Sequence, residues 1–156
     1  MERTVTEAIG STLINNLSLL EADIKNCPNE LWEKKYGGDI YWHQIYHTMV
    51  ATFAMLQNEK TSKLRTDIPD SIGMLKGGEY SGDYSKERML QFVEKTKKHL
   101  TTYFSYMSDS LFSNKVDFFG KNISILDLLL INVGHIMYHI GACDAALRDN
   151  GGQAAM

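Results

Sequence analysis

Two pairs of histidines, each spaced by four residues within an apolar stretch, constrain this chain more than any other feature. His43 and His47 form the first pair, and His135 and His139 form the second in the apolar run Ile131–Ile140. In a helix, residues four apart project from the same face, so each pair directs two imidazoles toward one point. The spacing therefore predicts helices at both places and the ligand geometry that a divalent transition metal requires.

Length and composition indicate one globular domain. The chain has 156 residues, 44% of them hydrophobic, and only two prolines. A chain of this length buries a substantial core without disulfide or metal support, and its apolar share is too high for a disordered protein. We expect a single domain over residues 1–150 and a disordered tail over residues 151–156.

Charge and cysteine content exclude several classes of protein. The net charge is -3, the pI is about 5.9, and no basic stripe is present, which argues against nucleic-acid binding. No stretch approaches the ~20 uninterrupted apolar residues of a membrane span, and Met1-Glu2-Arg3-Thr4 lacks the apolar core of a signal peptide. Cys27 and Cys143 show no CxxC spacing, so we expect a cytoplasmic protein in a reducing compartment with no membrane partner.

Hydrophobic periodicity predicts four amphipathic helices. They run over Thr6–Lys25, from Asp39 as N-cap to about Leu56, from Ser85 to about Met107, and from the Ser124–Asp127 capping box to about Arg148. No strand pattern of comparable strength is present. The fold class is therefore all-α, a four-helix bundle.

Two connections carry information about the topology. Residues 29–38 contain Leu31, Trp32 and Tyr36, so we expect an ordered loop that packs on the bundle. Residues 58–83 are polar and glycine-rich, and this length is unusual within a compact domain. We interpret the second connection as a functional lid or as a long crossover between distant helix ends, and the crossover is the topology we favour.

Bundle cores hold metal sites built from side chains on facing helices. His135 and His139 supply two ligands, and the second helix must supply a third from His43 or His47. Three nitrogens and one open position form a catalytic rather than a structural arrangement, able to activate a bound water or thiol. The same donors accept zinc, nickel, iron or manganese.

A bundle whose histidines are only buried structural residues is the simplest alternative, because an isolated HxxxH pair is a weak signal. The second pair, on another apolar helix face, strengthens the metal hypothesis. Ile136, Met137 and Tyr138 stand between His135 and His139, so the HExxH glutamate of zinc proteases is absent and that mechanism is not indicated.

Four segments together resemble the DinB-like (DinB/YfiT) metalloenzyme superfamily over nearly the whole chain. They are Pro28-Asn29-Glu30-Leu31-Trp32, Trp42-His43-Gln44-Ile45-Tyr46-His47-Thr48, Tyr84-Ser85-Lys86-Glu87 and Gly134-His135-Ile136-Met137-Tyr138-His139-Ile140-Gly141. Each segment is modest alone, whereas their order and spacing are fairly specific.

The resemblance implies a four-helix bundle with a histidine triad for a divalent metal, often as a homodimer. The first ligand of such proteins lies in a W-x-x-x-x-H pattern that Trp42 and His47 match, so the implied metal ligands are His47, His135 and His139. We expect Zn or Ni at these ligands, with Fe or Mn as alternatives. Relatives include transferases and isomerases that use low-molecular-weight thiols such as bacillithiol or mycothiol. Many relatives read H-x-G-Q-L where this chain has His139-Ile140-Gly141-Ala142-Cys143, which puts any particular substrate in doubt.

We therefore expect a divalent-metal-dependent enzyme, a thiol-dependent S-transferase or related transferase, acting on a small-molecule substrate as a homodimer. The alternatives are a metal-dependent hydrolase that shares every ligand, and a non-enzymatic stress-related binding bundle.

For several neighbouring residues we expect a structural role rather than a functional one. We expect His43 to be a polar residue at the helix mouth rather than a fourth ligand, and Cys143 to be a small buried residue rather than a thiolate ligand. Tyr138 is expected in the core, and His99 on the surface. Gly141 costs about 1 kcal/mol relative to alanine in a helix, so a close helix contact or space beside the metal is expected there.

Overall fold

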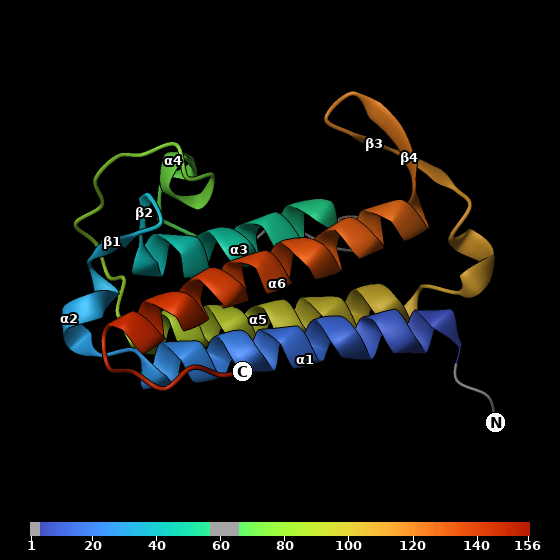
Figure 1. Ribbon diagram of the computed structural model, residues 1–156. Helices are drawn as coiled ribbons and strands as arrows, with labels where there is room; N and C mark the ends of the chain where they lie inside the picture. The colour runs from blue at the N-terminus through green and yellow to red at the C-terminus, as the bar shows by residue number, and fades with distance from the viewer. Residues whose placement is uncertain (1–3, 57–65) are drawn as a thin grey trace.

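The computed structural model describes residues 4–56 and 66–156, and within them four long helices form the body of the protein (Figure 1). They are α1 (Val5–Asn26), α3 (Tyr41–Met55), α5 (Lys86–Ser105) and α6 (Ile125–Asp149). Their apolar faces meet in one core, which includes fully buried Leu13, Ile45 and Leu100. The predicted four-helix bundle is confirmed.

The order of the helices shows a crossover connection. α1 packs against α5 and α6, and α3 packs against the same two helices. α3 and α5 run in one direction along the bundle while α1 and α6 run in the other (Figure 1). α5 therefore starts at the same end of the bundle as α3, so the topology has the crossover that the long 58–83 connection predicts. Residues 57–65 lie outside the described part of the chain, as do residues 1–3.

The starts of α5 and α6 follow from local capping. Ser85 accepts a hydrogen bond from the Arg88 amide and caps α5. At α6 the Ser124 hydroxyl accepts from the Asp127 amide at 3.0 Å, and the Asp127 carboxylate accepts from the Ser124 amide at 3.1 Å. This reciprocal arrangement satisfies backbone donors that the first helical turn leaves without partners. It fixes where α6, and with it the second histidine pair, begins.

The predicted N-cap of the second helix was wrong. Asp39 lies in a short hairpin, in which β1 (Lys35–Tyr36) pairs with β2 (Asp39–Ile40), and α3 begins after Ile40 without a side-chain cap. Gly37 and Gly38 adopt φ angles of 66° and 102°. Two consecutive residues with positive φ make the tight turn that suits a hairpin. The glycine pair therefore turns Asp39 back along Tyr36 instead of into the helix.

A second hairpin was not predicted at all. β3 (Lys115–Phe118) pairs with β4 (Lys121–Ser124) directly before α6. Phe119 and Gly120 form its two-residue turn with φ angles of 52° and 76°. The usual sequence signal for such a turn is Asn-Gly or Asp-Gly, and the turn was not recognised because Phe119 stands in the first of these positions. The hairpin stands out from the bundle above the start of α6 (Figure 1).

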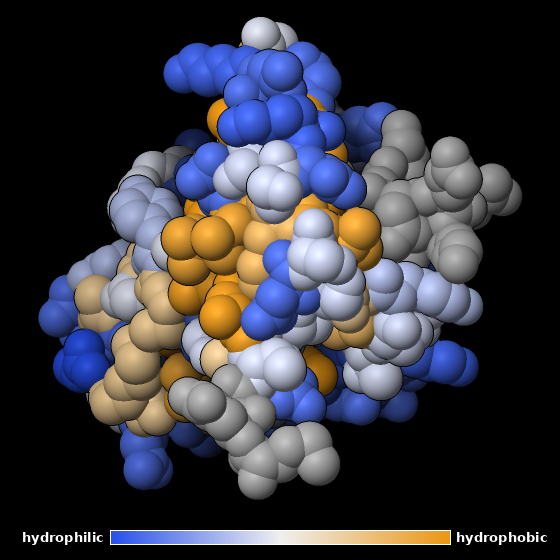
Figure 2. Space-filling model, turned by 90° about the vertical axis from the view of Figure 1, so that its right-hand side faces the viewer, coloured by the Kyte–Doolittle hydropathy of each residue, from blue (hydrophilic) through white to orange (hydrophobic). Residues whose placement is uncertain are grey.

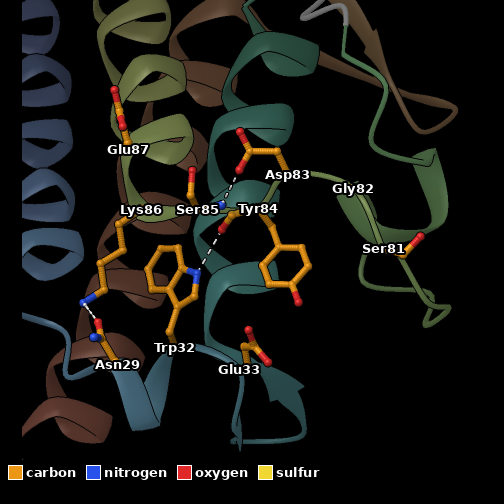
Figure 3. A pocket seen from close by; sticks show the side chains of 10 residues that line it. All are labelled: Asn29, Trp32, Glu33, Ser81, Gly82, Asp83, Tyr84, Ser85, Lys86 and Glu87. Carbon is orange, nitrogen blue, oxygen red and sulfur yellow. Dashed lines mark hydrogen bonds between the residues drawn. The ribbon is translucent and has the colours of Figure 1, made fainter.

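The connector after α1 is ordered, as predicted. It contains the single-turn helix α2 (Asn29–Trp32), whose Leu31 and Trp32 are buried. The Trp32 indole N–H donates to the Tyr84 carbonyl at 2.9 Å, which ties α2 to the start of α5 (Figure 3). A shallow hollow of about 600 Å³ lies at this junction, and its lining includes Glu33, Asp83 and Lys86.

The C-terminal residues differ from the expected disordered tail. The Ala155 amide donates to a carboxylate oxygen of Asp23 at 3.2 Å and to one of Asp144 at 2.7 Å. The Asn26 side chain donates to the Gln153 carbonyl. These buried carboxylates need a donor, and the tail supplies it by lying across α1 and α6.

By length and composition alone, α6 is apolar enough to cross a membrane, and about a third of its most apolar stretch is buried in the bundle. The core helix of a soluble protein passes the same test, and α6 packs along α1 and α3 with Asn132, His139 and Asp144 buried. The remainder of the apolar stretch leaves side chains such as Leu130 and Tyr138 in solvent. Seen from the end where α6 begins, apolar surface gathers below the hydrophilic hairpin (Figure 2).

Candidate metal centre

Three histidines from two helices meet inside the bundle. His47 of α3 and His135 and His139 of α6 each offer a ring nitrogen, and these three atoms all lie within 4.8 Å of one another. The Nε2 atoms of His47 and His135 are 3.0 Å apart. Because α3 packs directly against α6, one residue on the first helix faces the i, i+4 pair on the second. We call these three residues the His triad.

The connection between α3 and α5 fixes the orientation of the His47 ring. Its short helix α4 (Asp70–Gly73) lies against α3, and the His47 Nδ1–H donates to the Gly73 carbonyl at 2.9 Å. A carbonyl only accepts, so Nδ1 carries the proton and Nε2 keeps its lone pair. Metal-binding histidines commonly have this arrangement, because the second hydrogen bond sets the tautomer and raises the basicity of the ligand nitrogen.

Burial keeps the triad neutral. Desolvation lowers the pKa of His139 to about 3 and that of His135 to about 4, and repulsion from the neighbouring triad rings adds to both shifts. Desolvation also lowers the pKa of His47, although the Gly73 carbonyl opposes this change. Three neutral imidazoles at neutral pH are three lone-pair donors, which is the state that a metal ligand needs.

The donor set fits a divalent transition metal. Tetrahedral zinc with Zn–N bonds near 2.0–2.1 Å places its ligand nitrogens about 3.4 Å apart. The separations in the triad span that value, so small side-chain rotations bring the three nitrogens to bonding distance. Among the described residues, buried Nδ1 of His135 and Nδ1 of His139 have no hydrogen-bond partner. Unlike Nδ1 of His47, these two atoms therefore make no second hydrogen bond that would set the tautomer of the ring.

Two further candidates lie outside the triad. His43 is buried one turn before His47, with its ring edge-on to Trp42 at a centroid distance of 4.1 Å. Cys143 is buried and a free thiol, and desolvation strongly raises its pKa. Neither residue belongs to the cluster of ligand atoms found in the described part of the chain. These positions agree with the structural roles expected for His43 and Cys143.

Two expectations about single residues were wrong, and for Gly141 one of the two expected explanations is excluded. Tyr138 is 72% exposed rather than buried, because it lies on the side of α6 that faces away from the bundle. His99 is buried rather than on the surface, with its ring stacked on Phe53 and its Nε2–H donating to the Leu56 carbonyl at 3.0 Å. A methyl group added at Gly141 would meet nothing within 4 Å, so no close helix contact explains that glycine.

An apolar pocket beside the triad was missed by the sequence analysis. Its volume is about 500 Å³. It is lined by His47, Ala51, Ala54, Met55, Met74, Asp117, Phe118, Phe119, Ile131 and His135. The available signal was the row of small residues Ala51 and Ala54 after His47, but the hairpin that forms the opposite wall could not be foreseen. The hollow of Figure 3 contains no triad residue and is a separate feature.

Fold and site together define a helical bundle with a three-histidine cluster between its second and fourth long helices. No protein-family model matches the chain, and a search of curated proteins finds no match. The crystal structure of a DinB-like protein from Bacillus cereus does match, with a TM-score of 0.74 and 16% sequence identity over 99% of this chain and 97% of that one. The chain therefore has a DinB-like fold, as the resemblance implies. At this identity the likeness concerns the fold and carries no activity with it.

Proposed function

We propose that this protein is a divalent-metal-dependent enzyme, a thiol-dependent S-transferase or a related transferase, with the His triad as its metal site. The convergence of three neutral ring nitrogens from α3 and α6 carries this proposal. We further propose zinc or nickel as the metal, although iron and manganese use the same donors.

The triad leaves room for a reactant. Three protein nitrogens leave at least one coordination position open, as in catalytic rather than structural zinc sites. When bound there, a divalent metal lowers the pKa of a coordinated thiol or water and polarises a substrate oxygen. The Gly73 carbonyl holds the His47 ring in place, and the apolar pocket next to His47 and His135 keeps bulk water away from a reacting sulfur.

Metal content tests the ligand set. We expect protein purified without a metal-affinity tag to contain about one divalent ion per chain by elemental analysis, and His47→Ala, His135→Ala and His139→Ala to lose it. His43→Ala and His99→Ala are matched controls that remove a buried histidine outside the triad, so both should retain the ion. Full metal content in His47→Ala would refute the assignment.

A thiol-transfer screen tests the reaction. Metal-loaded protein is incubated with several electrophiles, with and without a small thiol, and loss of the electrophile is followed by mass spectrometry. Turnover that requires the thiol supports the transferase. Turnover that proceeds equally without it reassigns the same site to hydrolysis by metal-activated water.

We also propose that the protein acts as a cytoplasmic homodimer. The outer side of α6 presents Leu130 and Tyr138 to solvent, 54% and 72% exposed, with open space above Gly134 and Gly141. Apolar side chains on an exposed helix face favour association with another surface. Light scattering should give twice the chain mass, and Tyr138→Lys should reduce it to one. The free buried thiols of Cys27 and Cys143 suit a reducing compartment.

A further inference from the structure

The apolar pocket begins at the His triad and extends toward the bundle end where α6 starts. On α3 its wall continues from His47 through Ala51 to Met55, one helical turn at a time, and on α6 it runs from His135 back to Ile131. Eight residues of helix measure about 12 Å. A molecule in this pocket therefore has one end against two triad rings and the other near the β3–β4 hairpin.

Small side chains on α3 create the space. Elsewhere on this helix several residues that face the core are large, such as Ile45, Met49 and Phe53. Ala51 and Ala54 occupy the positions where the helix faces the hairpin and the start of α6. Alanine at both positions keeps this volume open, since a leucine at either would project into it.

The far wall comes from outside the bundle. Phe118 and Phe119 of the hairpin line the pocket together with Met74, which follows α4. Phe119 is 81% exposed although it is aromatic, and it holds a positive φ that glycine or asparagine adopts more readily. Methionine adapts its shape to different apolar ligands. These side chains form an adjustable apolar wall.

The lining of the pocket contains one acidic side chain. Among the described residues that line the pocket, Asp117 carries the single carboxylate, and it lies on the exposed side of the hairpin. Apart from Asp117, His47 and His135, the side chains of this lining are apolar, which disfavours a heavily hydroxylated ligand. A cavity of this size, largely apolar with a few polar groups, is typical of sites for small organic molecules.

We infer that the pocket binds the second substrate of the proposed enzyme, a small and mostly apolar molecule whose one polar, reacting group faces His47 and His135. That the bound molecule is a substrate rests on the proposed function, whereas its chemical class rests on the lining of the pocket. The apolar body of the molecule lies against Ala51, Ile131 and the hairpin phenylalanines.

Methionine methyl groups report on occupancy. Protein labelled with ¹³C at the methionine methyls is titrated with cyclohexanol and, as a matched control, with inositol, which has the same ring but a hydroxyl on every carbon. We expect saturable shifts of the Met55 and Met74 signals with cyclohexanol, at an affinity on the order of millimolar for so small a ligand. Met89, buried on α5, should not respond. Equal responses to both compounds, or shifts at Met89 alone, would overturn the inference.

Matched substitutions locate the binding. Ile131→Ser should weaken cyclohexanol binding at least threefold, whereas Leu130→Ser should leave it unchanged. These neighbours are both on the exposed side of α6, at 40% and 54%, but only Ile131 lines the pocket. Any effect of self-association is therefore shared. Ala54→Phe should abolish binding by filling the space, and because Ala54 is exposed this variant remains folded.

Metal loading separates this inference from the proposed function. The titration is run on chelator-treated protein and again on protein loaded with cobalt(II), whose unpaired electrons broaden the proton signals of a nearby ligand. Binding of cyclohexanol to protein that takes up no metal would refute the proposed function and leave the pocket. Metal uptake without any response of Met55 and Met74 would refute the pocket and leave the metal site.

Discussion

Asp23 and Asp144 form a buried carboxyl pair whose behaviour with pH is predictable. Asp23 on α1 is 0% exposed, and burial raises its pKa from 3.8 to about 8, with a further rise from its hydrogen bond to Asp144 and the charge of that residue. The Ala155 amide opposes the rise by donating to the Asp23 carboxylate. Cys143, Tyr41 and the more distant Arg148 complete its surroundings. Between pH 4 and 8 the folded protein therefore holds one proton at this pair that the unfolded chain has lost.

The consequence for stability has a definite sign. Where the folded state binds one proton more than the unfolded state, the free energy of unfolding falls by about 1.4 kcal/mol per pH unit. For Asp23 this fall extends from about pH 4 to about pH 8, where the folded protein also releases the proton. Asp23→Asn has no proton to lose, and its amide N–H still donates toward Asp144. The stability of the variant relative to the parent should thus grow by about 2 kcal/mol between pH 6 and pH 8.

Urea unfolding followed by circular dichroism at pH 6, 7 and 8 measures this difference, and comparing the two proteins at each pH cancels the contribution of other titrating groups. In thermal unfolding, 2 kcal/mol corresponds to about 4–8 °C for a chain of this length. Glu79→Gln, which removes an exposed carboxylate in the long connection, is the control. Its stability relative to the parent should not grow with pH. A constant difference between Asp23→Asn and the parent across this range would show that the pair holds no extra proton.

Three other predictions concern single positions. Gly73→Ala should weaken metal binding about tenfold in a competition titration, because its Cβ would lie 3.2 Å from Tyr46 and 3.3 Å from Val50 and displace the carbonyl that holds His47. Phe119→Asn should raise the free energy of unfolding by about 0.5–1 kcal/mol, since asparagine tolerates the positive φ at this turn; an unchanged urea midpoint would contradict this. Asn132→Leu should also stabilise, by about 1–2 kcal/mol, because both polar atoms of this fully buried side chain lack a partner among the described residues; a lower melting temperature would show that the amide has a structural role.

Hydrophobic periodicity predicted the four long helices, because each of them buries an apolar stripe. It did not predict the path of the chain at the glycine turn before α3 or at the C-terminus. The bounds of α1 and the caps at Ser85 and Ser124 follow from local rules, because proline and hydroxyl side chains act on their immediate neighbours. Asp39 was assigned to a helix because the Gly37-Gly38 turn before it was not recognised as a hairpin. The tail was expected to be disordered because its partners, Asp23 and Asp144, are distant in sequence.

The candidate site divides in the same way. The i, i+4 spacing placed His135 and His139 on one face, but from the residues alone the third ligand was either His43 or His47. The choice of His47 came from the resemblance, and the packing of α3 on α6 brings that residue to the other two. The role of Gly73 could not be predicted, because a backbone carbonyl leaves no trace in the pattern of side chains. The apolar pocket depends on a hairpin whose turn contains phenylalanine instead of asparagine.

The hydrogen bond between His47 and Gly73 makes the interior of the bundle responsive to a segment on its exterior. Gly73 belongs to α4, a four-residue helix in the connection, and not to any of the four long helices. While α4 is seated, the inward nitrogen of His47 is the electron-rich one. If α4 lifts by an ångström, the imidazole is free to exchange tautomers and to turn. A molecule that binds over α4 would thereby change the affinity of the protein for an ion without contacting any of the three rings.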